Sequence, residues 1–137
     1  MNKISVLITF LVISVQIHGQ AISESDFLGS WKVQRVTQKP SGPDIIPILD
    51  GFKKGIFTFY KSGKFGFNTT SNEKEFLELI DMFDNTGWKL EKDQQLIRIG
   101  AEEDEYSILG IYVNKSDGIL NFHIDESGLK FEMSKIK

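Results

Sequence analysis

Residues 56–68 read IFTFYKSGKFGFN, and this stretch decides the fold. Aromatic residues occupy alternate positions on both sides of Ser62-Gly63, so their side chains fall on one face of an extended chain. Glycine accepts the positive φ angle at which a chain reverses, and a Ser-Gly pair between two alternating runs is therefore a hairpin signal. The stretch predicts two antiparallel strands with an aromatic face.

The same alternation recurs along the chain. Short apolar runs separated by turn residues predict eight strands, at residues 31–36, 56–60, 64–68, 88–91, 96–99, 106–113, 119–124 and 129–134. Tight turns favour an antiparallel meander, and closing the meander into a barrel removes its unpaired edges. A two-sheet sandwich is the alternative, but it usually needs crossover loops, which the sequence does not offer. We expect an all-β fold, an eight-stranded antiparallel up-and-down β-barrel with one short α-helix.

The helix is predicted at residues 71–83, where apolar residues have the i, i+3, i+4, i+7 spacing of one helical face, namely Phe76, Leu79, Ile80 and Phe83. Asn72 is a suitable N-cap, and Glu75 three residues later would complete a capping box. A second interruption covers residues 38–54, where prolines and glycines predict an irregular loop. This loop also carries apolar residues, which must cover something because exposed apolar surface is costly.

The first nineteen residues have the pattern of an export signal. Lys3 is followed by an uncharged apolar run at residues 4–15. Residues 16–19 then end in a small residue, as expected at a signal-peptide cleavage site. The run is shorter than the about 20 residues that a membrane span needs, so an uncleaved anchor is the weaker alternative. We expect cleavage near Gly19 to Ala21, a folded domain at residues 20–137, and a periplasmic or secreted location.

Composition excludes several function classes. The chain has 137 residues and no cysteine, which excludes disulfides, cysteine-ligated metal sites and cysteine catalysis. Removal of residues 1–19 changes the net charge from −3 to −4, because Lys3 is the only charge lost. An acidic surface disfavours nucleic acid, which is bound through clustered Lys and Arg. We therefore expect no nucleic-acid partner.

Catalytic signatures are absent from the sequence as well. His123 is the only histidine once residues 1–19, which include His18, are removed. A serine triad needs a positioned histidine base, and the chain has no Gly-x-Ser-x-Gly nucleophile motif. One histidine cannot supply the two or three ligands of a histidine metal centre, and alternation places His123 on the surface. We expect no enzyme activity, no catalytic residue, no metal and no cofactor.

Residues 102–105, EEDE, form one strong acidic run. Calcium prefers clustered oxygen ligands, but the run lacks the alternate spacing and the glycine of an EF-hand loop. We interpret it as a solvated turn before the next strand.

Three short motifs resemble a known family. Residues 28–33 (LGSWKV) open the first predicted strand with a Gly-x-Trp pattern, and residues 86–90 (TGWKL) contain a similar entry to a later strand. Residues 57–65 (FTFYKSGKF) combine a strand, a Ser-Gly turn and an aromatic strand. Together these motifs resemble the secreted lipocalin-like domains of bacteria, a calycin-type family, over most of residues 26–136.

The resemblance implies that Gly29 and Trp31 close one end of the barrel, where the family's tryptophan packs. It also implies a long first loop lying across the open end as a lid, here through Ile45, Ile46, Ile48, Leu49 and Phe52. Lipocalins commonly stack an arginine near the last strand on this tryptophan, whereas this chain offers Lys130, Lys135 and Lys137. The usual disulfide is absent too, and these differences point to a remote relative.

The function depends on what fills the barrel. Aromatic residues at alternate strand positions could line one cavity, namely Phe57, Phe59, Phe65, Phe67, Trp88, Phe122 and Phe131. An eight-stranded barrel is just wide enough for side chains or for one small ligand. A non-enzymatic carrier would bind a small hydrophobic ligand among these residues. In the alternative, side chains fill the core, and the 45–52 loop or another exposed face binds a protein partner. Neither hypothesis includes a stable membrane span.

Overall fold

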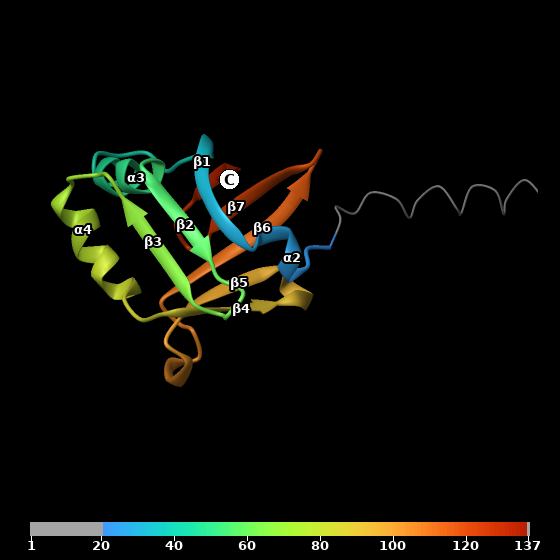
Figure 1. Ribbon diagram of the computed structural model, residues 1–137. Helices are drawn as coiled ribbons and strands as arrows, with labels where there is room; N and C mark the ends of the chain where they lie inside the picture. Colours follow the sequence, from blue (N-terminus) through green and yellow to red (C-terminus); the bar gives the residue numbers. More distant parts are fainter. Residues whose placement is uncertain (1–20, 137) are drawn as a thin grey trace, which may run out of the picture.

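The computed structural model of the protein describes residues 21–136 (Figure 1). The predicted export signal, residues 1–19, lies outside the described residues, and the predicted domain at residues 20–137 is described except for its first and last residue. No helix in the described part of the chain combines the length and apolarity needed to cross a membrane.

Eight strands form an antiparallel sheet in the order β3-β2-β1-β8-β7-β6-β5-β4. The predicted all-β up-and-down barrel is thereby confirmed. The strands are β1 (Gly29–Gln38), β2 (Gly55–Phe59), β3 (Phe65–Thr69), β4 (Gly87–Glu91), β5 (Leu96–Gly100), β6 (Leu109–Ser116), β7 (Ile119–Ile124) and β8 (Leu129–Ile136).

The hairpin predicted at residues 56–68 is formed by β2 and β3. Phe57 lies opposite Phe67, and Phe59 lies opposite Phe65, so the aromatic face of one strand meets that of the other. The predicted start of β6 at Tyr106 is wrong. Glu105 and Tyr106 have φ angles of 57° and 55°, a left-handed backbone that cannot continue a strand, and β6 begins only at Leu109.

The two edge strands, β3 and β4, meet at one point and nearly close the barrel. Lys64 forms an isolated antiparallel bridge with Gly87. The Phe65 N–H donates to the Thr86 carbonyl at 3.0 Å, and the Trp88 N–H donates to the Gly63 carbonyl at 2.9 Å. Backbone groups that would be exposed at two sheet edges are therefore partly paired with each other.

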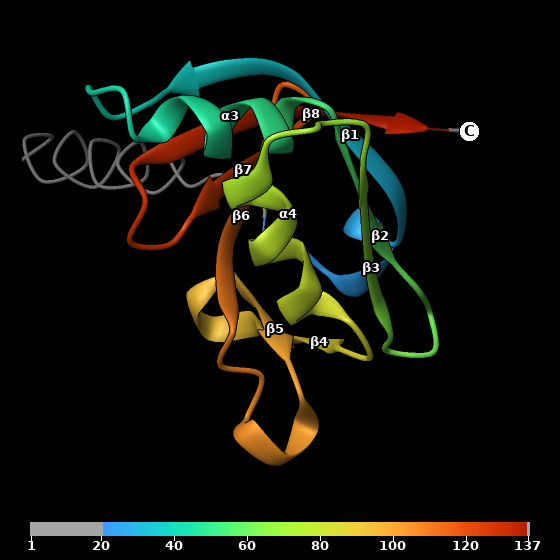
Figure 2. The ribbon, with the colours of Figure 1, turned by 90° about the vertical axis from the view of Figure 1, so that its left-hand side faces the viewer.

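Helices account for the rest of the described structure. The α-helices are α2 (Glu24–Phe27), α3 (Ile45–Lys53) and α4 (Lys74–Ile80), and the short 3₁₀ helices are η2 (Asp81–Phe83), η3 (Lys92–Gln94) and η4 (Glu102–Asp104). The helix predicted at residues 71–83 is thus present as α4 followed by η2. In Figure 2, α3 and α4 lie across the barrel between β3 on one side and β6 and β7 on the other.

Two predictions about these helices are wrong. Residues 38–54 are not irregular throughout, because α3 occupies residues 45–53; Pro47 falls in its first turn, where a missing N–H breaks no helical hydrogen bond. The capping box of α4 is absent, because the N-cap is Glu73 instead of Asn72. The Glu73 N–H donates instead to the Ser71 hydroxyl at 3.2 Å.

Candidate functional site

The interior of the barrel contains every aromatic residue that the sequence predicted to line a ligand pocket. All seven side chains are buried. They come from five strands: Phe57 and Phe59 from β2, Phe65 and Phe67 from β3, Trp88 from β4, Phe122 from β7 and Phe131 from β8. The periodicity therefore identified their common face correctly, while their role in ligand binding stays a prediction.

These rings contact one another across the barrel. Phe122 of β7 meets Phe57 and Phe59 of β2 edge-on, with ring centroids 5.6 Å and 6.0 Å apart. Phe59 lies 6.4 Å from Trp88, again edge-on. Edge-to-face contacts at these distances are favourable for aromatic pairs. Aromatic side chains from opposite walls of the barrel therefore meet in its interior.

One end of the barrel holds the predicted plug, Gly29 and Trp31. Trp31 is buried, and its Nε1 donates to the Phe27 carbonyl at 2.8 Å. The Phe27 ring in turn packs 5.1 Å from Trp88 and 5.3 Å from Phe59. The Lys135 ammonium lies over the Trp31 ring, 5.7 Å from its centroid, and Gly29 begins β1 beside the same lysine. A lysine of the last strand thus supplies the cation over this tryptophan.

The α2 end of the barrel also contains residues that sequence analysis missed. Ile22 and Phe27 are buried, and the Ile22 N–H donates to the side-chain oxygen of Gln95. Both residues precede the first alternating run, so strand periodicity gave no signal for them. Phe27 follows Asp26 in a four-residue helix whose capping interaction with Ser23 is the local feature that could have identified it.

The opposite side of the interior is covered by α3, at the place of the predicted lid. Phe52 is buried and stacks almost parallel to Phe57 at 5.9 Å, and it lies 5.7 Å from Phe131 of β8. The other predicted lid residues are less buried: Ile45, Ile48 and Leu49 are half-buried, and Ile46 is exposed. The lid set therefore divides into one side chain that is buried in the barrel, three that are half-buried and one that faces solvent.

Polar contacts hold the C-terminal half of α3 in place. The Ser71 hydroxyl is buried and donates to Asp50 Oδ2 at 2.7 Å, and the Thr69 hydroxyl donates to the Gly51 carbonyl at 2.9 Å. A Cβ on Gly51 would overlap the ring of Phe76 in α4, so glycine permits this close approach. The hydrogen bond from Ser71, with a smaller contribution from Lys54, lowers the pKa of the Asp50 carboxyl.

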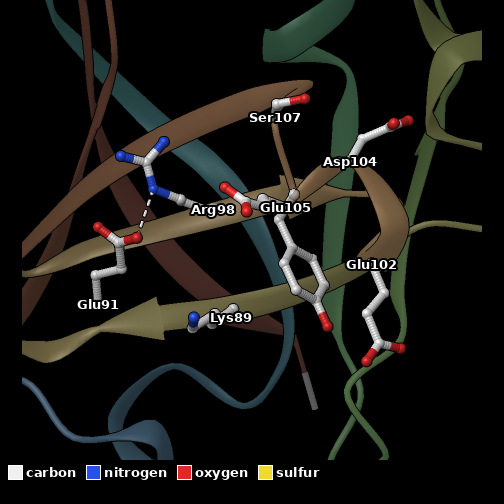
Figure 3. A pocket seen from close by; sticks show the side chains of 8 residues that line it. Lys89, Glu91, Arg98, Glu102, Asp104, Glu105 and Ser107 are labelled. Atoms are coloured by element: carbon white, nitrogen blue, oxygen red, sulfur yellow. Dashed lines mark hydrogen bonds and ion pairs between the residues drawn. The ribbon is translucent and has the colours of Figure 1, made fainter.

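A second site lies outside the barrel, where the loop between β5 and β6 folds back over β4 and β5 (Figure 3). It is a polar cleft of about 760 Å³ lined by Lys89, Glu91, Arg98, Glu102, Asp104, Glu105, Tyr106 and Ser107. We refer to it as the outer cleft. The prediction of a solvated turn at residues 102–105 did not identify it, because strand residues from β4 and β5 complete the lining.

The loop over the outer cleft has a backbone that only a few residues can adopt. Gly100 ends β5, and a Cβ there would lie 2.7 Å from the Ser107 nitrogen and 2.8 Å from the Tyr106 carbonyl carbon. The Tyr106 N–H donates to the Ala101 carbonyl at 3.0 Å, and the Ile108 N–H donates to the Ile99 carbonyl at 2.9 Å. The glycine thus lets the chain turn back on itself and hold Tyr106 at the cleft.

Charges in the outer cleft are arranged by strand register. Lys89 and Arg98 are direct cross-strand partners, so two cations lie side by side on the strand wall. Arg98 Nε donates to Glu91 Oε1 at 2.7 Å, and both side chains are partly exposed. Figure 3 shows Glu102 and Asp104 on the loop, with both side chains directed away from Lys89 and Arg98. The strand wall of the cleft therefore carries both cations and the Glu91 carboxylate that pairs with one of them.

His123 is half-buried on β7, with its ring 6.0 Å from that of Tyr112 on β6. Its neighbours Phe122 and Ile124 are buried, in agreement with the predicted outward direction of His123. Among residues 21–136, no group of three or more histidine or acidic side chains is arranged to hold a metal ion.

Comparison of the chain with protein-family models, with curated proteins and with solved structures finds no match. By its fold, the protein is an eight-stranded antiparallel barrel with an aromatic interior and a polar cleft on its outer wall.

Proposed function

We propose that this protein is a non-enzymatic interaction module with a filled barrel, which binds a protein partner through its outer surface. The observation that carries this proposal is the contact between rings from opposite walls. Phe52 of α3 reaches both Phe57 and Phe131, and Phe122 reaches both aromatic residues of β2. A barrel whose interior is occupied in this way is stabilised by its own side chains and recognises other molecules from outside.

The surface proposed for the partner is the outer side of α3, α4 and η2, which we call the cap surface. Three large apolar side chains are exposed there: Ile46 (61%), Met82 (52%) and Leu77 (43%). The ring of Phe52 packs 5.1 Å from that of Phe76, so α3 and α4 are neighbours. Exposed apolar residues on neighbouring helices support protein binding over a purely structural role.

The remaining parts of the proposal concern family and location. A remote lipocalin-like relationship is supported by Trp31, which is buried at one barrel end with the Lys135 ammonium over its ring. Export is supported by the sequence of residues 1–19, with the partner then being another periplasmic or secreted protein.

The test compares the wild-type protein with the variant Ile46→Ser/Leu77→Ser after chemical crosslinking in its own host. We expect a crosslinked protein whose yield falls about tenfold or more in this variant, since both substitutions remove apolar contact area. The matched control is Ile119→Ser, because Ile119 is also exposed (42%) but lies on β7. Equal yields from all three proteins would contradict the cap surface as the binding site.

A carrier of a small hydrophobic ligand is the second candidate, and one observation favours it. The interior is covered by a helix, α3, with a single ring inserted, so displacement of Phe52 alone would open space between Phe57 and Phe131. Native mass spectrometry of protein purified from its host distinguishes the two functions. A retained small molecule, together with a change in Trp88 fluorescence across a lipid panel, would support the carrier and contradict the filled module.

A further inference from the structure

We infer that the barrel opens as a gate between the tip of the β2–β3 hairpin (residues 60–65) and the entry to β4 (residues 86–88), while the other strands stay paired. This junction, which we call the seam, is separate from the cap surface and does not depend on the proposed protein partner. The seam is joined by few bonds, it is open to solvent on its outer side, and the two ends of the barrel are covered.

Three hydrogen bonds cross the seam within the described part of the chain. The Phe65 N–H donates to the Thr86 carbonyl at 3.0 Å. Trp88 donates twice, from its backbone N–H to the Gly63 carbonyl and from its Nε1 to the Tyr60 carbonyl, each at 2.9 Å. Trp88 is therefore the residue of β4 that holds the hairpin tip in place.

Every other pair of neighbouring strands is joined over a longer ladder. Between four and seven residue pairs connect each of them, whereas within residues 21–136 the seam has a single isolated bridge, between Lys64 and Gly87. Segments held by few hydrogen bonds open at a lower free-energy cost than the centre of a sheet. The seam is therefore the line along which the barrel separates first.

The two ends of the barrel are covered by side chains, whereas the seam is open to solvent. Phe27 and Trp31 are buried at the α2 end, and Phe52 is buried beneath α3. A cleft of about 370 Å³ lies along the outer side of the seam, lined by residues of the hairpin tip, of the entry to β4 and of the 101–106 loop. Separation of the hairpin tip from β4 would give water a lateral path to the Trp88 ring.

Ring contacts close the seam again after it opens. The Phe59 ring of the hairpin lies 6.4 Å from that of Trp88, and the Phe65 ring lies 5.7 Å from that of Phe83, both edge-on. Such contacts are favourable, and they add to the three hydrogen bonds. The closed seam is therefore the stable state, and the open seam is a minor state in equilibrium with it.

The experiment is native-state hydrogen exchange of the whole protein, followed by NMR at urea concentrations well below the unfolding transition. The reporters are the Phe65 N–H, the Trp88 N–H and the Trp88 indole N–H, because each donates across the seam. After correction for intrinsic exchange, we expect the three to share one opening equilibrium. Its dependence on urea should be above zero but smaller than that of global unfolding, and its protection about tenfold or more below that of the most protected amides of β7 and β8.

Gly87→Ala loosens the seam directly. The new Cβ would lie 2.7 Å from the Gly63 carbonyl oxygen, so the backbone must shift, and the three seam hydrogens should exchange about tenfold or more faster. Gly66→Ala is the matched control, because a Cβ there meets its nearest neighbour at an ordinary 3.5 Å. It should leave the exchange of the seam hydrogens unchanged.

Ile111→Val separates local opening from global unfolding. Ile111 is buried on β6, two strands away from β4, so the loss of one methylene destabilises the closed and the open seam alike. The most protected amides should exchange faster, while the seam hydrogens should not. The inference is overturned by seam hydrogens that exchange at unrelated rates or without dependence on urea, by equal acceleration in Gly66→Ala and Gly87→Ala, or by seam exchange that rises in Ile111→Val together with that of the most protected amides.

Discussion

The barrel interior and the outer cleft are built on the same strands by different physical effects. On β4, Trp88 is buried in the interior, and the next residue, Lys89, lines the outer cleft. The interior is stabilised by apolar burial and ring contacts, whereas the cleft is shaped by a loop backbone and by charges that water still reaches. The comparison teaches that strand alternation places a buried apolar side chain and an exposed charged side chain one residue apart.

Replacing a central interior ring should give the largest effect. Phe122 is fully buried and contacts Phe57 and Phe59, so Phe122→Ala would remove these contacts and leave a cavity. We expect the free energy of unfolding to fall by about 3–5 kcal/mol, measured by urea denaturation followed by tryptophan fluorescence.

The control for this prediction is Tyr112→Ala. Tyr112 lies on the neighbouring strand β6 but faces outward and is partly exposed. Its loss should cost less than about 1 kcal/mol. If the two variants lost equal stability, the described division of the barrel into a buried and an exposed face would be incorrect.

The second prediction disturbs the cleft while leaving the interior intact. In Gly100→Ala the new Cβ would overlap the backbone of Tyr106 and Ser107, so the loop must shift. We expect a loss of about 1–3 kcal/mol. Amide shifts should change in the loop and on β5, while the near-ultraviolet circular dichroism of the interior aromatic residues stays as in the wild type.

Gly66→Ala is the matched control, because a Cβ on Gly66 meets its nearest neighbour, in Tyr60, at an ordinary 3.5 Å. Amide shifts of the 101–107 loop should then remain at their wild-type positions. A loop unchanged by Gly100→Ala would show that the close approach at Gly100 does not set its shape.

Sequence patterns predicted the interior well because burial imposes a period. The seven aromatic residues were identified from alternation alone, and all are buried on one face of the sheet. The Ser62-Gly63 turn was predicted for the same kind of reason, since Gly63 has a φ of 93° that few other residues adopt. A turn that requires one residue type, such as this glycine, can be predicted directly from the sequence.

The features that the sequence analysis missed depend on tertiary contacts and not on the periodicity of apolar residues. α3 was predicted as a loop because residues 38–54 contain three prolines, although only Pro47 lies within the helix and it falls where a helix tolerates it. The outer cleft was missed because Glu105 and Tyr106 adopt left-handed φ angles without being glycine. The backbone of Tyr106 lies against Gly100, a contact between residues that no local pattern connects.

The third prediction concerns the polar support of the interior. Ser71→Ala removes the hydroxyl that donates to Asp50 and accepts from the Glu73 N–H. We expect a loss of about 1 kcal/mol in the free energy of unfolding, the usual contribution of a hydrogen bond. Ser62→Ala, at an exposed serine in the hairpin turn, should leave the free energy of unfolding unchanged.

The smallest effect should appear in the pH dependence of stability. The Ser71 hydrogen bond and the Lys54 ammonium favour the ionised form of Asp50 and lower its pKa in the folded state. A lowered folded-state pKa stabilises the fold above the ordinary carboxyl pKa, and the stabilisation is lost as the pH falls through the folded-state value.

Asp50→Asn should therefore melt at a lower temperature than wild type near neutral pH, and the difference should shrink once Asp50 is protonated in the wild type. The effect is small because Lys54 is exposed and Asp50 is only half-buried, so water screens their interaction. Asp44→Asn is the control, since Asp44 is the N-cap of the same helix but makes no side-chain capping hydrogen bond. A constant difference between Asp50→Asn and wild type down to acid pH would show that the charge of Asp50 is not what stabilises the fold at this position.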